Sequence, residues 1–536
     1  MIIVSADLNT VVMKVARRAE NAPPEVLKHA FVPVGPLLAH LELPEHQILF
    51  GRRGTGKTHL MRFLQEKCSG EGSLAIYVDL RQVGAAEDVF STRQNNFSQQ
   101  VTSLLVDVVE HVHSQIYEQV LTERWTAHLG QISGALDALG TAATQIQVVG
   151  ETEVEEQRES SMFANEGQSI ELSVARDPRA AWKAEASTRR SKRSAERRVD
   201  RGREAHHVLI GPLSSAIRHL ASAISPHELW LFVDEWSALP LDLQPLLADL
   251  LRRTFLSTPG VVVKISAIHG RSRFADLEAA GTPIGLELGA DTAATLDLDD
   301  FLLFRNDAAT TLDFYSTLLH RHVTAMTVRP DRVDRPTQRL IHALNSPAKL
   351  TAQLFASAGS FHSLVVGAEG VPRDALQIAG LAAGNAYNQP IATVHVATAT
   401  RDFFLRDKDG RIPKHARQVF NNLMNQAVRQ KSRIIPLRHD GESDDEIIQR
   451  LYDARVIHRV RQGMSLDSQH PTETYDIYVI DYGCFLGLVR SRRIGAVNNA
   501  LDPGARFADA GEIEIRRRSF VGMTPRWYRQ RSVNAD

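Results

Sequence analysis

The fold is decided by the stretch Gln47-Ile48-Leu49-Phe50-Gly51-Arg52-Arg53-Gly54-Thr55-Gly56-Lys57-Thr58. A short apolar run, which predicts a strand, ends here in a glycine-rich turn, and Lys57 opens a predicted helix. The turn matches the phosphate-loop pattern G-x-x-x-x-G-K-S/T at every position. A glycine turn before a helix can also arise by chance, but the strand before it and the helix after it favour a phosphate-binding loop.

The residue types of this loop have a direct chemical reason. Its three glycines allow successive backbone N–H groups to turn toward a phosphate, and the positive end of the following helix faces the same anion. We expect Lys57 to reach the β- and γ-phosphates and the Thr58 hydroxyl to bind Mg²⁺. The sequence therefore predicts a site for ATP and Mg²⁺ formed by Gly51, Arg52, Arg53, Gly54, Thr55, Gly56, Lys57, Thr58 and His59.

A second motif has the form of a buried strand that ends in two carboxylates, Leu229-Trp230-Leu231-Phe232-Val233-Asp234-Glu235. In a parallel sheet, the carboxyl end of such a strand delivers its acidic groups to the ligand crevice. We expect Asp234 to hold Mg²⁺ and Glu235 to act as the general base that polarises the attacking water. Apolar runs that end in Asp-Glu occur in many α/β proteins, but together with a complete phosphate loop this one indicates a nucleotide-hydrolysing site.

A third strand is predicted at residues 261–268, and it ends close to further polar residues. A polar side chain at this tip would contact the γ-phosphate or orient water, and the candidates are Ser266 and His269; the alternative is an ordinary strand-end side chain. An arginine that acts across a subunit boundary would project from the edge of the nucleotide domain. The candidates, each of which is also explained as a surface arginine, are Arg252, Arg253, Arg271 and Arg273.

The bulk composition limits the class of protein. A chain of 536 residues with 43% hydrophobic content can form about two to four domains with real cores. The net charge of −1 provides no overall attraction to nucleic acid or membrane, so such binding requires a local patch. Cys68 and Cys484 have no metal or redox spacing, which favours a reducing compartment. No apolar run reaches the ~18–20 residues of a membrane span and no secretory signal is recognisable, so we expect a cytoplasmic protein.

The C-terminal half predicts helices from residue 300 onward and then a helix–helix–two-strand pattern that is typical of a winged helix. Its helices are expected at 414–429 and 447–454, and its strands at 456–460 and 475–481. Basic side chains distributed in this way occur on surfaces that contact the DNA backbone and also on winged helices that bind proteins. They comprise Arg455, His458, Arg459 and Arg461 on the expected wing, and Arg490, Arg492, Arg493, Arg516, Arg517 and Arg518 in or before the tail.

In this order of parts the chain resembles the AAA+ ATPases, and within them the origin-recognition-like and STAND-type branches. Residues 51–58 match Walker A, residues 229–235 match Walker B, the strand end near His269 resembles sensor 1, and Gly370-Val371-Pro372-Arg373 resembles sensor 2. The resemblance implies that Arg373 reaches from a helical lid to the γ-phosphate. The angle of the lid would then differ between the ATP-bound and the ADP-bound states. The resemblance also implies that a winged helix follows the lid.

Two features depart from the pattern of the family. The two Walker motifs lie farther apart than an AAA+ core requires, which implies an insertion between them. This insertion contains a basic run that is either a solvated segment or an arm for DNA or a protein partner. The second departure is His269, because Asn, Ser or Thr is commoner at the sensor-1 position.

The predicted fold class is an α/β P-loop NTPase (an AAA+ core, with a parallel sheet flanked by helices) followed by an all-α lid and a winged-helix domain. The expected segments are an N-terminal helical segment at 1–30, the core at 31–290 with its insertion at about 140–206, the lid at 300–408, the winged helix at 410–490 and a basic tail at 491–536.

Three functions stay open, and in each of them the expected ligands are ATP or ADP and no membrane is involved. The first is an ATP-binding and ATP-hydrolysing switch that forms a homo-oligomer and acts on duplex DNA through residues 410–530. The second is a STAND-like ATPase in signalling or anti-phage defence, whose winged helix serves oligomerisation or binds a protein effector. The third is a scaffold that binds ATP with little turnover. The expected catalytic residues are Lys57, Glu235 and Arg373.

Overall fold

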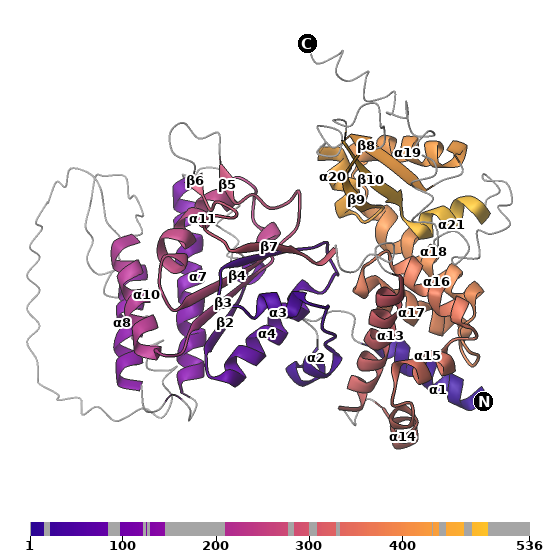
Figure 1. The fold of residues 1–536 in the computed structure, drawn as a ribbon, viewed down its shortest axis with the longest axis horizontal. Helices are drawn as coiled ribbons and strands as arrows, with labels where there is room; N and C mark the ends of the chain where they lie inside the picture. The colour runs from indigo at the N-terminus through magenta and orange to yellow at the C-terminus, as the bar shows by residue number, and fades with distance from the viewer. Residues whose placement is uncertain are drawn as a thin grey trace, which may run out of the picture.

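The structure is a computed structural model that describes residues 2–15, 22–83, 97–121, 125, 129–144, 210–276, 284–299, 308–328, 333–430, 433–438, 446–465 and 474–490. These residues form an α/β unit, a helical unit and a smaller mixed unit (Figure 1). The α/β unit occupies the left of Figure 1, and the other two units lie together on the right. Of the expected insertion at about 140–206, only the first few residues lie within the described ranges.

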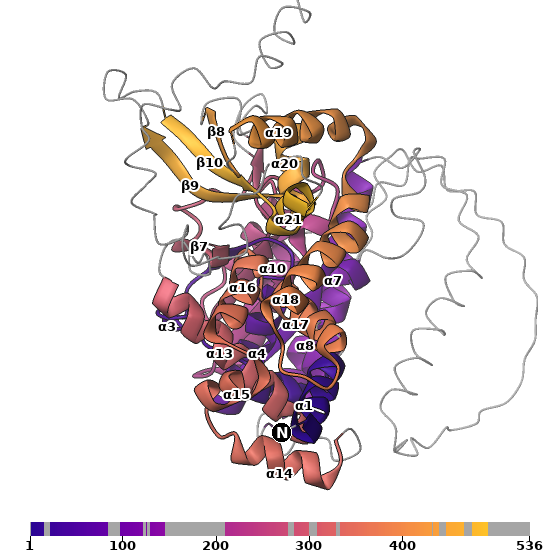
Figure 2. The ribbon, with the colours of Figure 1, turned by 90° about the vertical axis from the view of Figure 1, so that its right-hand side faces the viewer.

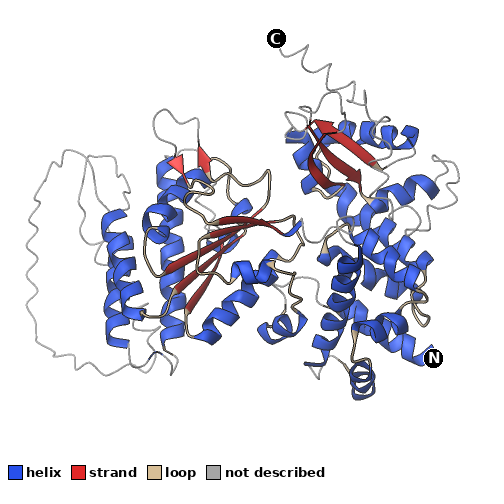
Figure 3. Ribbon diagram, viewed as in Figure 1, coloured by secondary structure: helices blue, strands red, loops and turns tan. Residues whose placement is uncertain are grey.

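The α/β unit is built on a five-stranded sheet in the order β2-β3-β4-β1-β7, and every strand pair in it is parallel (Figure 3). Four of its strands are buried along their whole length, as expected for a parallel sheet that is covered on both faces. The strands are β1 (Gln47–Phe50), β2 (Leu74–Asp79), β3 (Leu229–Asp234), β4 (Val261–Ala267) and β7 (Ala294–Asp297).

Helices cover both faces of this sheet, and successive strand residues alternate between the two sides. Ile48 and Ile76 pack in a core with α7 (Phe97–Val120), α8 (Leu129–Thr144), α10 (Ile210–Ile224) and α11 (Gln244–Leu251). Leu49 and Tyr77 pack on the other face with α3 (Leu37–Leu41) and α4 (Lys57–Glu71). The unit also contains α5 (Leu80–Val83), the short helices η3 (Trp236–Ala238) and η4 (Arg252–Leu256), and a hairpin of β5 (Ala275–Asp276) and β6 (Ile284–Gly285).

The helical unit consists of α13 (Ala308–Ala325), η5 (Met326–Val328), α14 (Arg335–Ala343), α15 (Pro347–Leu354), α16 (Ala358–Ala368), α17 (Pro372–Ala386) and α18 (Thr393–Phe403). Three of these helices begin where a polar side chain accepts a hydrogen bond from a backbone N–H of the first turn. The capping residues are Asp334, Ser346 and Ser357. Such caps satisfy N–H groups that have no partner inside the helix, and they define where each helix starts.

The N-terminal helix α1 (Ile2–Lys14) packs in the core of the helical unit and lies beside α17 (Figure 2). Leu8 is fully buried in that core. The Asn9 amide donates hydrogen bonds to the carbonyls of Tyr387 (2.7 Å) and Gln389 (2.9 Å), directly after α17. The next helix, α2 (Pro24–Ala30), instead packs between α13 and α4. The first 30 residues therefore contact two units.

The third unit is a winged helix, formed by α19 (Arg417–Gln430), β8 (Ile434–Arg438), α20 (Glu446–Asp453), β9 (Ile457–Ser465), β10 (Thr474–Ile480) and α21 (Tyr482–Arg490). Its sheet is antiparallel in the order β8-β10-β9. The sequence predicts only the last two of these strands. Pro436 lies within β8, where it weakens the strand signal, and it is tolerated because β8 is an edge strand.

Three short helices connect the helical unit to the winged helix: η6 (Phe404–Lys408), η7 (Asp409–Arg411) and η8 (Lys414–Ala416). The predicted fold class, an α/β P-loop core followed by a helical lid and a winged helix, is confirmed. Within the described residues, no helix has the length and apolar character needed to cross a bilayer.

We expect Leu8→Ala to lower the free energy of unfolding of the helical unit by about 2–5 kcal/mol, because it removes a fully buried side chain from the core that α1 shares with α17. Thr10→Ala, on the exposed side of the same helix, serves as the control. Urea titrations followed by circular dichroism measure both variants. Equal effects of the two substitutions would contradict the docking of α1.

Candidate nucleotide-binding site

The phosphate loop lies between β1 and α4, and its shape requires glycine. Gly54 and Gly56 have φ angles of +92° and +106°, in the left-handed region that side chains with a Cβ rarely adopt. A Cβ at Gly54 would lie 2.8 Å from Nε of Arg373 and 3.0 Å from a methyl carbon of Val371. The loop therefore carries a glycine at the point where the helical unit rests on it.

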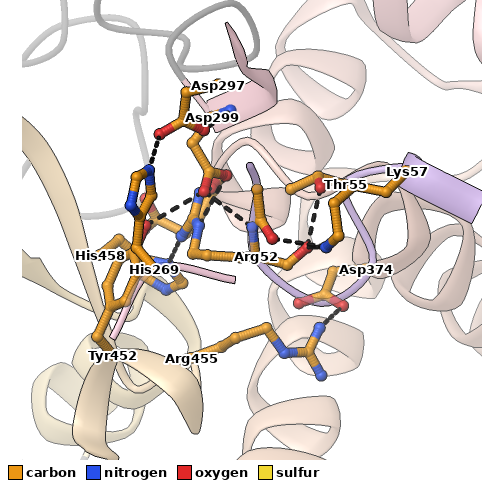
Figure 4. Close-up of polar contacts among 12 residues, drawn as sticks. Arg52, Thr55, Lys57, His269, Asp297, Asp299, Asp374, Tyr452, Arg455 and His458 are labelled. Atoms are coloured by element: carbon orange, nitrogen blue, oxygen red, sulfur yellow. Dashed lines mark hydrogen bonds and ion pairs between the residues drawn. The ribbon is translucent and has the colours of Figure 1, made fainter. Parts of the chain in front are cut away.

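Lys57 folds back over this loop. Its Nζ donates to the carbonyls of Gly51 (2.6 Å) and Arg52 (3.1 Å), and the Thr55 hydroxyl donates to the Arg52 carbonyl at 2.8 Å (Figure 4). Burial lowers the pKa of Lys57, while the carboxylates of Asp234 and Glu235 oppose that shift. The ammonium of Lys57 thus lies against the loop and interacts electrostatically with the carboxylates of Asp234 and Glu235.

The two Walker motifs meet at the carboxylate of Asp234. One of its oxygens accepts hydrogen bonds from the hydroxyls of Thr58 (2.7 Å) and Tyr77 (2.6 Å), and the other accepts from the Ser266 hydroxyl. These residues come from the start of α4 and from three adjacent strands, β2, β3 and β4. A threonine hydroxyl beside a carboxylate is an oxygen donor set that suits Mg²⁺.

Glu235 follows directly in a strained conformation. Its φ of +61° is unusual for a residue with a side chain, and its backbone N–H donates to Asp234 (2.8 Å) and to the Ser266 hydroxyl (3.2 Å). Burial raises the pKa of its carboxyl, and the neighbouring Asp234 raises it further; Arg81, whose Nη1 lies 3.6 Å from the carboxylate, opposes the shift.

Both motifs border one cavity of about 460 Å³. One end is polar and predominantly basic, and it is lined by Arg53, Lys57, Thr58, Arg81, Glu235, Arg373 and Arg411. The other end is formed mainly by α2 and α13 and is lined by Val26, Leu27, Ala30, His59, Leu318 and His322. A cationic end joined to a largely apolar end suits a ligand with a polyphosphate and a flat base.

His59 lies at the apolar end, where its Nε2 is 2.8 Å from the Leu27 carbonyl and its ring meets Phe31 edge to face. The ring of His322 lies 6.1 Å from the His59 ring, centroid to centroid, and its partial burial lowers the pKa of His322 to about 3. Only His59 was included in the predicted site. His322 comes from α13, and no local motif marks it.

The structure separates the two sensor-1 candidates. His269 does not line the cavity: its Nε2 lies 2.9 Å from an Asp297 carboxylate oxygen, and its ring stacks on Phe50 at 4.0 Å. Ser266, the other candidate, donates to the carboxylate of Asp234. The geometry therefore favours Ser266 at this position. Because β4 ends at Ala267, Ser266 lies within the strand and His269 lies beyond it.

Arg373 lies at the cavity, at the start of α17. Its backbone N–H donates to the Gly54 carbonyl at 3.1 Å. The four candidate arginine fingers lie elsewhere and pair with acids of the same chain. Arg252 and Arg253 pair with Asp249, Arg271 pairs with Asp453 of α20, and Arg273 pairs with Asp276.

Arg52, within the phosphate loop, is almost completely buried and joins the three units (Figure 4). Its Nε donates to one oxygen of Asp299 and its backbone N–H to the other, each at 2.9 Å. Its two remaining nitrogens contact the carbonyl of Glu369 in the helical unit (3.1 Å) and Nδ1 of His458 in the winged helix (2.5 Å). The phosphate-loop motif places no constraint on the residue at position 52, so the sequence did not reveal this role.

The contact between Arg52 and His458 defines the tautomer of the neutral histidine ring. A guanidinium can only donate, so Nδ1 of His458 must accept, and Nε2 carries the hydrogen that is donated to Asp481 at 3.0 Å. Protonation of Nδ1 would remove the acceptor of Arg52. Burial, with further effects of Arg52 and Lys408, accordingly lowers the pKa of His458 to about 3, while Asp481 opposes the shift.

The prediction that Arg455 and His458 present charge on the wing is wrong. Arg455 is buried and pairs with Asp374 of α17, which also forms an ion pair with Lys408 (3.1 Å). Arg455 lies two residues before β9 and His458 is the second residue of that strand, where the winged helix meets the helical unit and the phosphate loop. Arg459 is partly buried against the ring of Tyr452, and the side chain of Arg461 lies outside the described residues.

We expect His458→Gln to reduce the acid sensitivity of the protein, because glutamine can accept from Arg52 and donate to Asp481 without titrating. The folded-state pKa of His458 lies below its ordinary value of 6.5. The contribution of this residue to stability is therefore complete above pH 6.5, and it is lost by up to about 1.4 kcal/mol per pH unit as the pH falls from there toward 3.

Urea titrations at pH 7.5 and 5.5 test this, with His415→Gln, at an exposed position in the connecting helix η8, as the control. If wild type and His458→Gln lose equal stability between the two pH values, the assigned tautomer is wrong.

Comparison with known proteins finds a similarity to one family model over part of the chain. The family model described as ORC-CDC6-like matches residues 15–75, which include the phosphate loop. Among solved structures, the chain is similar to the Orc1 protein of Aeropyrum pernix in complex with DNA, with 13% identity and a TM-score of 0.29 over 89% of this chain and 94% of that one. None of the curated proteins matches the chain. The resemblance to origin-recognition-like AAA+ proteins that the motifs indicate is confirmed by the match to this family model.

Proposed function

We propose that the protein is a molecular switch that binds and hydrolyses ATP, and in which the bound nucleotide determines how the helical unit and the winged helix sit on the α/β core. The observation that carries this proposal is the convergence of Lys57, Thr58, Glu235 and Arg373 on one cavity, with Asp234 bonded to Thr58. These residues come from two units, so a nucleotide that contacts both would favour one arrangement over another.

Each residue has a defined task in this reaction. Lys57 exchanges its two loop carbonyls for phosphate oxygens, and Arg373 contacts the γ-phosphate from the start of α17. Glu235 accepts a proton as a water oxygen bonds to the γ-phosphorus and the bond to the β,γ-bridging oxygen breaks. Thr58 and Asp234 would hold Mg²⁺, which would supply positive charge to neutralise the phosphates. Tyr77 and Ser266 fix the orientation of the Asp234 carboxylate.

We further propose that the switch acts on duplex DNA through residues 410–530 and assembles as a homo-oligomer. The winged-helix fold and the basic residues of the C-terminal tail support the proposed contact with DNA. The tail at 491–536 lies outside the described residues. Because the net charge is −1, the attraction to phosphates must come from this local patch.

One observation favours the STAND-like alternative, in which the winged helix serves as a packing element. The helix α20, which precedes the wing, lies against the core: Asp453 pairs with Arg271, and the Gln449 side chain lies next to Gly270. Because α20 contacts the core directly, a conformational change in the core would alter the packing of the winged helix.

Glu235→Gln is expected to lower the ATP turnover number by about 10²–10⁴-fold while ATP affinity stays within a few-fold, because it removes the base and keeps the shape. Lys57→Ala is expected to abolish binding. Since the pKa of Glu235 is raised, turnover should fall on acidification at a pH above 4.5, the ordinary value for this carboxyl. Steady-state kinetics and equilibrium nucleotide binding measure these effects. Turnover that is unaffected by Glu235→Gln would contradict the role of Glu235 as the general base, whereas no turnover in the wild type would favour a scaffold that binds ATP.

Duplex DNA affinity is expected to fall steeply with salt, since each neutralised phosphate contributes about 0.9 to the logarithmic slope. Replacing Arg516, Arg517 and Arg518 with glutamine should flatten that slope by up to about 3 if all three contact phosphates. Filter binding across a salt series, in ATP and in ADP, provides the measurement. Assembly driven by ATP without any DNA affinity would instead support the STAND-like alternative.

A further inference from the structure

The basic end of the cavity receives one arginine from an unexpected part of the chain. Arg411 is the last residue of η7, in the connection between the helical unit and the winged helix, and it lines the same cavity as Arg53 of the phosphate loop. Both side chains are partly exposed to solvent. Among the described residues, neither guanidinium has an ion-pair partner or a side-chain hydrogen bond.

The charges around Arg411 leave this end of the cavity suited to an anion. Burial lowers the pKa of Arg411, Arg455 and Arg53 lower it further, and Asp407 and Asp374 oppose the shift. Arg53 also acts electrostatically on Glu235, the expected base. Arg53 thus lies within electrostatic reach of both the expected site of phosphate cleavage and Arg411. Two like charges that face each other repel, but an anion between them is attracted by both.

The turn that carries Arg411 is held to the winged helix on both sides. Arg417, the first residue of α19, donates to the Asp409 carboxylate at 2.5 Å and to the Asp409 carbonyl at 2.7 Å. Lys408, just before the turn, is buried and pairs with Asp481 at 2.7 Å and with Asp374 of α17 at 3.1 Å. The turn that carries Arg411 is therefore attached to the winged helix through Asp409 and Lys408, whereas Arg53 belongs to the phosphate loop.

We propose that Arg411 is a nucleotide-binding residue that the winged-helix connection supplies to the site, and that the terminal phosphate of a nucleoside triphosphate bridges Arg411 and Arg53. The inference rests on the proposed function, because it concerns the same nucleotide. It adds a direct contact between the ligand and the segment that leads into the winged helix. A diphosphate, which lacks the terminal phosphate, leaves the two arginines facing each other without the bridging anion.

Equilibrium binding to the full-length protein tests this, with a non-hydrolysable ATP analogue and ADP as ligands. We expect Arg411→Gln to lower the affinity for the analogue by roughly 10-fold, which is the effect of losing a charge-assisted hydrogen bond. The affinity for ADP should change by less than about 2-fold. Arg411→Lys should recover part of the loss, because it restores the charge without the planar fork. Lys414→Gln, three residues along the same connection and outside the cavity lining, should change neither affinity.

A second readout follows the winged helix itself. In wild type, the analogue should slow amide hydrogen exchange of η7, η8 and α19 more than ADP does, and Arg411→Gln should remove that difference. The inference is overturned if Arg411→Gln binds the analogue as wild type does, or if it weakens ADP equally. Lys57→Ala distinguishes a failure of this inference from a failure of the proposed function. If Lys57→Ala loses nucleotide binding while Arg411→Gln binds the analogue as wild type does, the proposed function stands and this inference is wrong. If Lys57→Ala retains full binding, the proposed function fails.

Discussion

The arrangement of the molecule depends on the burial of one guanidinium, that of Arg52. A charged group removed from water is stable only if it is surrounded by acceptors, and removing one partner of such a group is strongly destabilising. The acceptors of Arg52 come from all three units, as Asp299, the Glu369 carbonyl and His458. Because Arg52 belongs to the phosphate loop, the shape of that loop and the positions of the two other units depend on one another.

The same short loop is contacted at other points by the same units. The Gly54 carbonyl accepts a hydrogen bond from the backbone N–H of Arg373 at the start of α17. Arg53 lines the same cavity as Arg411, which belongs to the winged-helix connection. A ligand can shift a conformational equilibrium only through contacts that differ between the two states. Here the loop that would bind phosphate is the structural junction as well, so no long pathway is needed to carry the effect of nucleotide to the winged helix.

Local sequence patterns predicted the two Walker motifs of this site. The burial of His458 depends on a contact with a residue that is distant in the sequence, so local patterns could not predict it. The two Walker motifs were found because their spacing and strand context are local, and parallel-sheet geometry then implied that Asp234 would meet Thr58. The position of His458 was mispredicted because exposure of a basic strand residue depends on what packs against it, which in this case is Arg52, 406 positions away. The choice between Ser266 and His269 depended on where β4 ends, a boundary that periodicity does not define to within a residue.

The docking of α1 has a consequence for biosynthesis. The helix leaves the ribosome long before α17, since the carbonyl that Asn9 binds belongs to Tyr387, 378 positions later. Until that carbonyl is made, the apolar side chains of Leu8, Val11 and Val12 lack their native core partners in α17. The helical unit thus closes only when the two distant parts of the polypeptide are both present, which makes its completion a late step in the maturation of the protein.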